Sequence, residues 1–321
     1  MPLTQLPAIY RRLIRPTPLV MVRLAADHPA IACKLDFLNP SGSTKDRIAA
    51  YILGKAMESG QLVPGRLVVE ASSGSTSIAM AMVCAHLGLK FAAVMPMGVS
   101  SERSMIIRAY GGRVIYTDAA RGMAGAMEEA RRLGVEESAF CPAQFENQDN
   151  VEAHRTGTAV EIIAQFAQAG LTKIDAIVSG VGTGGTLVGL LRGLNARGQN
   201  VRPVAAYPIK SSGALAGSGC FTEAECSSFS SCIPGVVDRL SKLYNPADLP
   251  GLMEIAVKDD LAIQTTRRLI RLGFPVGPSS GLNFTAAVEA ANRLGENASV
   301  VTVFPDRMER YFSTELFGGM T

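Results

Sequence analysis

The chain has 321 residues, which exceeds the size at which a single hydrophobic core usually stops growing, so two domains are expected. Hydrophobic residues make up 47% and charged residues 18%, a balance typical of a folded globular enzyme and not of a disordered chain. The formal net charge of +3 is too small and too dispersed for nucleic acid or an anionic membrane surface to be the main partner.

The sequence gives little support for membrane insertion or secretion. The most apolar window, residues 78–95, carries His86, Gly88 and Lys90 in its middle, which favours a buried helix followed by a strand over a transmembrane span. Residues 1–15 lack the apolar core and cleavage site of a secretory leader. We therefore expect no membrane partner and a cytoplasmic location.

The six cysteines are scattered and form no Cys-x-x-Cys pair, which is typical of reduced thiols in a cytosol. Cys220, Cys226 and Cys232 are evenly spaced, and this spacing raises the question of a metal site. Their segment has no histidine and lacks the spacing of zinc ligands, so we expect no metal.

Short β-branched runs alternate with helical stretches from residue 67 onward. The predicted elements are strand 67–69, helix 78–87, strand 91–95, helix 102–110 and strand 114–116, followed later by strands 176–178, 204–206 and 300–304. This rhythm predicts an α/β fold with two doubly wound parallel-sheet domains and the active site in the cleft between them. We place the main break near residues 147–152, where polar residues interrupt the pattern, and expect a surface or active-site loop over the Ser-, Gly- and Cys-rich residues 211–238.

Lys45 lies in the segment Asn-Pro-Ser-Gly-Ser-Thr-Lys-Asp-Arg, residues 39–47, directly before a predicted helix. Ser43 or Thr44 can cap that helix, and Gly60 is a suitable end. Apolar residues recur at helical spacing at Ile48, Ile52 and Ala56. A lysine at a helix start is usually a solvated charge. The positive end of the helix dipole disfavours an ammonium there, however, and this setting suits a nucleophilic amine that forms a Schiff base.

Two further loops open helices in a way that suits anions. In residues 70–77, Glu-Ala-Ser-Ser-Gly-Ser-Thr-Ser, hydroxyls and free amides can receive a carboxylate, although a plain serine-rich cap explains the same residues. In residues 180–186, Gly-Val-Gly-Thr-Gly-Gly-Thr, four glycines let backbone amides surround a phosphate. A dinucleotide-binding site is not indicated there, because the next strand ends in Tyr207-Pro208 and offers no acidic residue for a ribose hydroxyl. A Walker loop is not indicated either, because no lysine follows Gly185. A phosphorylated cofactor such as pyridoxal phosphate fits best.

With these segments in order, and with Gly-Pro-Ser-Ser-Gly at residues 277–281, the chain resembles the cysteine synthase family of fold type II pyridoxal-phosphate enzymes, which includes cystathionine β-synthases. The resemblance runs from about Thr17 to Thr314. We expect a smaller α/β domain over residues 40–150 that carries the substrate loop, and a larger one over residues 13–39 and 151–321 that carries the phosphate loop. The family also implies a homodimer.

The resemblance implies a role for each motif. Lys45 would hold pyridoxal 5'-phosphate as an internal aldimine and then take the substrate's α-proton. The phosphate would be bound by Gly182, Thr183, Gly184, Gly185 and Thr186, and the substrate carboxylate by Ser72, Ser73, Thr76 and Gln144. Ser279 falls where the family hydrogen-bonds the pyridine nitrogen. A hydroxyl does not keep that nitrogen protonated as a carboxylate would, so loss of a β-substituent is favoured over a long-lived carbanion.

The expected activity is therefore β-replacement on an O-activated serine or a related amino acid through an aminoacrylate, with a sulfide, thiol or amine as nucleophile. Two alternatives stay open, β-elimination by a serine or cysteine lyase or dehydratase, and a non-catalytic paralogue that binds another protein's C-terminal peptide. Lys210 and Arg239 could pair with a phosphoserine, although exposed surface charge is the more ordinary role.

Three departures from the family concern its substrate side. Ser75 stands where the family has Asn, which reaches the cofactor's phenolic oxygen, and Ser77 stands where it has Gly. Residues 226–234 replace the Gly-Ile-Gly loop near the substrate, so the substrate is left open. Tyr207 replaces a glutamate, with no consequence that the sequence explains.

Overall fold

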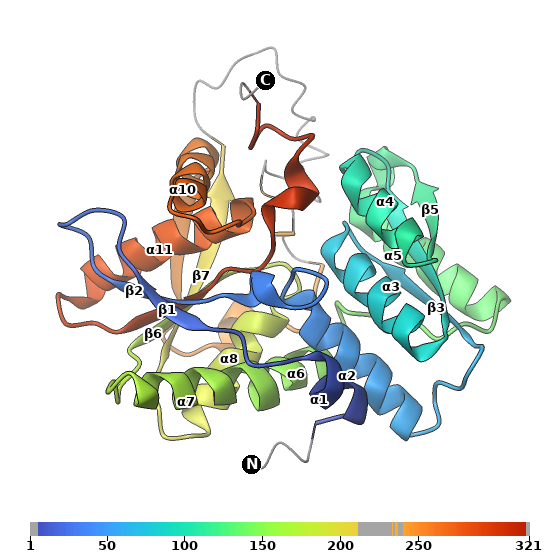
Figure 1. The fold of residues 1–321 in the computed structure, drawn as a ribbon, viewed down its shortest axis with the longest axis horizontal. Helices are drawn as coiled ribbons and strands as arrows, with labels where there is room; N and C mark the ends of the chain where they lie inside the picture. Colours follow the sequence, from blue (N-terminus) through green and yellow to red (C-terminus); the bar gives the residue numbers. More distant parts are fainter. Residues whose placement is uncertain (1–5, 211–232, 234, 237–239, 319–321) are drawn as a thin grey trace.

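The computed structural model describes residues 6–210, 233, 235–236 and 240–318 (Figure 1). Its strands form a six-stranded sheet in the order β1-β2-β9-β6-β7-β8 and a three-stranded sheet in the order β3-β4-β5. Neighbouring strands are parallel except β1 and β2, which pair antiparallel. The predicted α/β fold with parallel sheets is confirmed.

The bounds of the elements are as follows. The large sheet contains β1 (Leu19–Val22), β2 (Ile31–Lys34), β6 (Ala176–Gly180), β7 (Arg202–Ile209), β8 (Met253–Lys258) and β9 (Val300–Val303), and the small sheet β3 (Leu67–Ala71), β4 (Lys90–Pro96) and β5 (Arg113–Thr117). The helices are α1 (Ala8–Leu13), α2 (Lys45–Glu58), α3 (Ser75–Leu87), α4 (Ser101–Ala109), α5 (Gly122–Glu136), α6 (Asp149–Ala153), α7 (Ala159–Gln168), α8 (Gly185–Asn195), α10 (Asp259–Arg271) and α11 (Pro278–Leu294). Shorter helical turns are η2 (Asp36–Leu38), η3 (Ala119–Arg121), η4 (His154–Thr158, a π-turn), η5 (Pro246–Asp248) and η6 (Met308–Tyr311).

Helices cover both faces of the large sheet. Figure 1 shows α10 and α11 on one side and α7 and α8 on the other. Leu269 and Phe284 of the first pair and Phe166 and Leu190 of the second pack in separate apolar clusters. A strand with helices on both faces buries the side chains of both faces, and for this reason its sequence is mostly apolar instead of alternating.

The small sheet is covered in the same way. Val68 of β3 packs in a cluster with Ile52 of α2 and Ile78 of α3, whereas its neighbour Val69 packs on the other face with Met123 of α5. Successive residues of a strand point to opposite faces, so one strand serves both clusters.

Several boundaries differ from the sequence prediction. α3 begins at Ser75 and α8 at Gly185, each before its first apolar residue, because a helical first turn that faces a pocket needs no apolar side chain. Most of residues 147–152, where the main break was predicted, form the helix α6. The two domain ranges stay a prediction.

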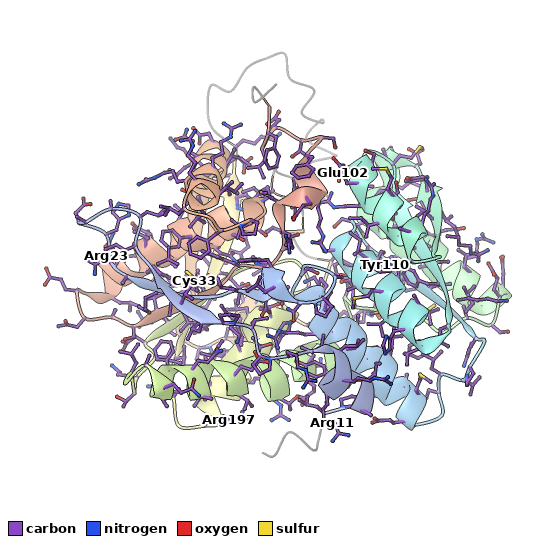
Figure 2. All side chains as sticks on the ribbon, viewed as in Figure 1. Arg11, Arg23, Cys33, Glu102, Tyr110 and Arg197 are labelled. Atoms are coloured by element: carbon purple, nitrogen blue, oxygen red, sulfur yellow. The ribbon has the colours of Figure 1, made fainter. Side chains whose placement is uncertain are left out.

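The segment 211–238 lies outside the described residues except for Ile233, Gly235 and Val236, so the predicted loop is not tested, and the same holds for Cys220, Cys226 and Cys232. Cys33, which Figure 2 labels, is a free thiol, as are Cys84 and Cys141. Within the described ranges, no helix is long and apolar enough to cross a bilayer. The same residues contain no group of three His, Cys, Asp or Glu side chains placed to hold a metal.

Candidate active site

A pocket lies where the starts of α2, α3, α8 and α11 converge, and it encloses about 940 Å³ including space open to solvent. This is the edge at which parallel α/β sheets bind ligands. The sequence-predicted residues in its lining are Lys45, Ser72, Ser73, Ser75, Thr76, Gln144, Gly182, Thr183, Gly184, Thr186 and Ser279. Gly185, the first residue of α8, is not in the lining itself.

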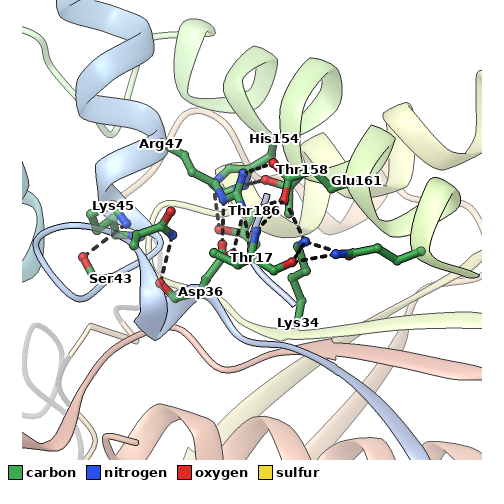
Figure 3. Close-up of polar contacts among 12 residues, drawn as sticks. Thr17, Lys34, Asp36, Ser43, Lys45, Arg47, His154, Thr158, Glu161 and Thr186 are labelled. Carbon is green, nitrogen blue, oxygen red and sulfur yellow. Dashed lines mark hydrogen bonds and ion pairs between the residues drawn. The ribbon is translucent and has the colours of Figure 1, made fainter. Parts of the chain in front are cut away.

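Lys45 is the first residue of α2, and its side chain reaches the pocket. Its backbone N–H donates to Ser43 Oγ at 3.3 Å (Figure 3), while its side-chain nitrogen has no hydrogen-bond partner in the described part of the chain. Burial lowers the pKa of Lys45 from its ordinary value, and the carboxylates of Asp306 and Asp36 oppose this shift without cancelling it. A lowered pKa makes available the neutral amine that imine formation requires.

The first turn of α3 presents unused amides. Its N-cap, Gly74, has a φ of 145° and no side-chain cap. Ser72 Oγ accepts from the N–H groups of Gly74 at 2.9 Å and Ser77 at 3.3 Å. The N–H groups of Ser75 and Thr76, by contrast, have no acceptor among the described residues. Free amides at the positive end of a helix dipole attract a carboxylate.

Gln144 and Glu70 support this turn from behind. Thr76 Oγ1 donates to Gln144 Oε1 at 2.6 Å, and Gln144 Nε2 donates to the carbonyl of Ala71 at 2.8 Å. Glu70 accepts from the backbone N–H of Gln144 at 3.2 Å. Burial raises the pKa of Glu70 to about 8, although backbone N–H groups act in the other direction. Near neutral pH, an anion at the start of α3 therefore does not meet a buried negative charge.

The start of α8 is packed so closely that only glycine fits. The N-cap Gly184 has a φ of 75°. A Cβ at Gly182 would lie 2.1 Å from the carbonyl oxygen of Gly235, and a Cβ at Gly185 would lie 2.0 Å from Asn150 Oδ1. Glycine thus brings the main chain against its neighbours without a side chain between, which is what a phosphate cradle requires.

The first turn of α8 also has unused amides, and the side chain of Thr186 in this turn contacts a buried histidine. The N–H groups of Thr186 and Leu187 have no acceptor within the described ranges. Thr186 Oγ1 lies 3.2 Å from His154 Nε2, and His154 Nδ1 lies 3.0 Å from Thr158 Oγ1 (Figure 3). Burial lowers the pKa of His154 to about 3, so the ring is neutral at physiological pH.

Asn150 joins the two helix starts. Its Nδ2 donates to the carbonyl of Gln144 at 2.9 Å, on the α3 side, and to Thr183 Oγ1 at 3.0 Å, on the α8 side. One fully buried amide group therefore fixes the distance between the two anion-binding turns.

A buried ion cluster holds α2 behind Lys45 (Figure 3). Arg47 donates from Nε to Asp36 Oδ2 at 3.0 Å and from Nη1 to Glu161 Oε1 at 2.6 Å. Lys34 lies 2.7 Å from Glu161. Burial raises the pKa of Asp36, but the charge and hydrogen bonds of Arg47, together with Lys34 and Thr17, outweigh burial and the pKa falls to about 2. These contacts position the first turn of α2, and hence Lys45.

Sequence reasoning did not identify Arg103, Asp306 and Tyr311, which also line the pocket. Asp306 Oδ2 accepts from Ser75 Oγ at 3.0 Å and from the Tyr311 hydroxyl at 2.7 Å, whereas its Oδ1 is buried without a partner. The Arg103 guanidinium carbon lies 4.9 Å from the centre of the Tyr311 ring. One signal was available, because Arg103 shares the buried face of its helix with Ile107, four residues on.

The chain is similar to known proteins over most of its length. The profile of the family described as "Pyridoxal-phosphate dependent enzyme" matches residues 10–306. A cysteine synthase of Staphylococcus aureus (strain Mu50 / ATCC 700699) is 38% identical over 309 residues, 95% of this chain and 96% of that protein. An O-acetylserine dependent cystathionine beta-synthase from Helicobacter pylori has a TM-score of 0.82 and 31% identity, over 97% of this chain and 98% of the other. A hydrogen sulfide-producing enzyme from Fusobacterium nucleatum has a TM-score of 0.85 and 32% identity, over 97% of this chain and 91% of the other.

These matches confirm the resemblance that the motifs carry and the cofactor that it implies. They extend over nearly the whole length of this chain and of each relative. The chain belongs to the pyridoxal-phosphate-dependent enzymes of the cysteine synthase family, with their type II fold.

Proposed function

We propose that this chain catalyses β-replacement on an O-activated serine or a related amino acid, with a sulfide, thiol or amine as nucleophile. The observation that carries the proposal is a lysine of lowered pKa, Lys45, in one pocket with two helix starts whose amides are unused. One start suits the phosphate of the cofactor and the other the carboxylate of an amino acid. The relatives include a cysteine synthase and an O-acetylserine dependent enzyme, which supports this substrate class.

The residues of the pocket fit pyridoxal phosphate. The glycine-lined start of α8, residues 182–186, would hold its phosphate, and the Lys45 amine would bond its aldehyde carbon. Ser279, whose hydroxyl has no partner in the described part of the chain, would serve the ring nitrogen. When bound, the cofactor supplies an electron sink for the electron pair released at the substrate's α-carbon.

On the substrate side, the chain would bind the carboxylate through the amides of Ser75 and Thr76 and the hydroxyls of Ser72 and Ser73. The Thr76 hydroxyl already donates to Gln144 Oε1, so Thr76 contributes its backbone N–H instead. One N–H of the Gln144 amide is engaged by Ala71, which leaves the other for the substrate.

Lys45 would also act as the general base. Its neutral Nζ accepts the proton from the substrate's α-carbon, and the carboxylate of Asp306 favours the ammonium that results. General bases of this kind contribute roughly 10²- to 10⁴-fold to a rate. A Lys45→Ala variant should lose at least that much activity, whereas Lys55→Ala, an exposed lysine of the same helix, should retain parental activity.

The decisive experiment separates replacement from elimination. The holoenzyme is mixed in turn with O-acetylserine, O-phosphoserine, cysteine and serine, and the absorption spectrum of the bound cofactor is followed. Sulfide, a thiol or an amine is then added, and the amino-acid product and pyruvate are quantified. Replacement predicts a new amino acid whose yield depends on the nucleophile. If the amount of pyruvate does not depend on the nucleophile, the result would favour elimination instead. Elimination is the chemistry suggested by the hydrogen sulfide-producing relative.

A spectrum that no amino acid alters would argue for a non-catalytic role.

We further propose the homodimer and the cytoplasmic location that the sequence suggested. Light scattering of the purified holoenzyme measures the first, and cell fractionation the second.

A further inference from the structure

Arg103 is a buried cation that has no anionic partner among the residues the structure describes. It lies in the first turn of α4, is only 4% exposed and lines the pocket. Within the described residues its guanidinium has no hydrogen-bond acceptor and no ion-pair partner, and its Nε is fully buried. An uncompensated buried guanidinium is costly, so a site that retains one is expected to receive an acceptor from elsewhere.

The other buried cations show what a structural arginine or lysine looks like in this chain. Arg47 donates to two carboxylates, Lys34 donates to a carbonyl and pairs with a carboxylate, and Arg310 donates to the carbonyls of residues 41 and 42. Lys45 lacks such partners within the described ranges, and Lys45 is the residue that the cofactor engages in our proposal. Arg103 shares this property with Lys45 and shares the same pocket.

Arg103 is held in place by packing and not by polar contacts. Its aliphatic stem crosses Gly74, where a Cβ would lie 2.1 Å from Arg103 Cδ. Its guanidinium lies over the Tyr311 ring, at 4.9 Å from the centroid. Both contacts fix the side chain and leave its N–H groups available to donate hydrogen bonds, which is the arrangement of a preorganised anion receptor.

Asp306 does not neutralise Arg103 directly. Its Oδ2 accepts from Ser75 and Tyr311, and no bond joins its Oδ1 to the guanidinium. The substrate's α-carboxylate has its own receptor in the unused amides at the start of α3. The anion for Arg103 is therefore a different group.

We propose that Arg103 is a specificity residue that binds a second oxyanion, a carboxylate or a phosphate, on one of the two reactants. This proposal rests on the proposed function and names its substrate class more closely. The oxyanion belongs either to the leaving group of the donor or to the nucleophile, and both sources share the chemistry that a planar guanidinium recognises.

Two kinetic comparisons with an Arg103→Gln holoenzyme separate these sources. With sulfide as nucleophile, O-phosphoserine is compared with O-acetylserine. With O-acetylserine as donor, 3-mercaptopropionate is compared with the uncharged 2-mercaptoethanol. The substitution should lower kcat/KM about 10- to 100-fold for the anionic member of one comparison or both, the loss expected for one charge-assisted contact. The neutral members should change less than about 3-fold. An equal loss with all four reactants, or no loss, would overturn the proposal.

A binding experiment tests the site without catalysis. Inorganic phosphate is titrated calorimetrically into holoenzyme saturated with L-alanine, so that both the cofactor phosphate and the α-carboxylate sites are filled. Phosphate should bind the parent and bind Arg103→Gln at least about 10-fold more weakly, while equal affinities would refute the assignment. This titration still decides the question if the parent turns over no donor, an outcome that would defeat the proposed function alone.

Two matched variants guard against a merely structural effect. Arg108 is an exposed arginine of the same helix, and Arg108→Gln should match the parent in every comparison. Arg103→Lys keeps the charge but loses the two-pronged geometry, so it should recover part of the selectivity for the anionic reactant. If Arg103→Lys instead lowers kcat/KM equally for all four reactants, Arg103 serves packing and the proposal fails.

Discussion

The starts of α3 and α8 face one pocket with the same kind of backbone, yet opposite chemistry lies behind them. Each has a glycine N-cap of positive φ and no side-chain cap. The carboxyl group of Glu70 accepts from the backbone N–H of Gln144, whose side chain contacts Thr76 in the first turn of α3, and the imidazole of His154 contacts Thr186 in the first turn of α8. Burial raises the pKa of Glu70 to about 8 and lowers the pKa of His154 to about 3.

Both groups are therefore uncharged between those two pKa values, and the amides and dipole of each helix alone attract the anion. An ionised Glu70 would repel the substrate's carboxylate, and a protonated His154 would be an unpaired buried charge. The two helix starts should consequently lose their suitability for an anion at opposite ends of the pH range. The substrate side is sensitive to alkali, and the cofactor side is sensitive to acid.

The largest effect is expected for His154→Gln. The pKa of His154 is about 3 in the folded chain and 6.5 ordinarily, so the unfolded chain binds an extra proton between these values and stability falls as the pH falls. From about pH 6.5 to 4.5 the parent should lose roughly 2.3 kcal/mol more than the variant, measured by urea unfolding at each pH. His86→Gln, an exposed histidine, should follow the parent. If the free energy of unfolding changes with pH in the same way for the parent and for His154→Gln, this account is contradicted.

Glu70→Gln tests the α3 side, where the sign is reversed. The pKa of Glu70 is about 8 when folded and 4.5 ordinarily, so its contribution is complete below pH 4.5 and is lost as the pH rises through 8. From about pH 6 to 7.5 the parent should lose roughly 2 kcal/mol relative to the variant. KM for the amino acid should rise above about pH 8 in the parent alone. Glu296→Gln is the exposed control, and a KM that rises equally in Glu70→Gln would remove repulsion by Glu70 as the cause.

The comparison also shows which parts of the site a sequence can predict. Lys45 and the glycines at residues 182–185 act through local backbone, namely the first turn of a helix and the turn before it. A short motif contains all the residues that such a turn needs, so the pattern of types is sufficient. The parallel sheets were predictable for a similar reason, because most residues of the buried strands are apolar and form short continuous runs.

Arg103, Asp306 and Asn150 could not be found in this way. Each acts through contacts between segments far apart in the chain, such as Ser75 with Asp306, and the sequence does not state which segments meet. Glu102, labelled in Figure 2, illustrates the same point, since it accepts from the backbone N–H of Ser313 at 2.7 Å and so joins α4 to the C-terminal segment. In the sequence, the one sign that Arg103 is buried is its four-residue spacing from Ile107.

Asn150→Ala is expected to weaken both helix starts together. The substitution removes the donors to the Gln144 carbonyl and Thr183 Oγ1, which costs about 1 kcal/mol of stability for each lost bond. The dissociation constant of the cofactor and KM for the amino acid should both rise about 3- to 10-fold. Asn297→Ala, at an exposed position, is the control. A change in only one of the two constants would show that the starts are positioned independently.

Ser75→Ala should have the smallest effect and sharpens the comparison most directly, because the family resemblance assigns this position to the cofactor. Ser75 Oγ donates to Asp306, so the substitution removes one partly buried bond and leaves Asp306 with its bond to Tyr311. We expect a loss of about 1 kcal/mol or less and an unchanged cofactor affinity, measured by unfolding and by cofactor titration. Ser101→Ala, at an exposed position in α4, is the matched control. A cofactor affinity at least about 10-fold weaker would mean that Ser75 leaves Asp306 in the holoenzyme, and the start of α3 would then serve the cofactor as well as the substrate.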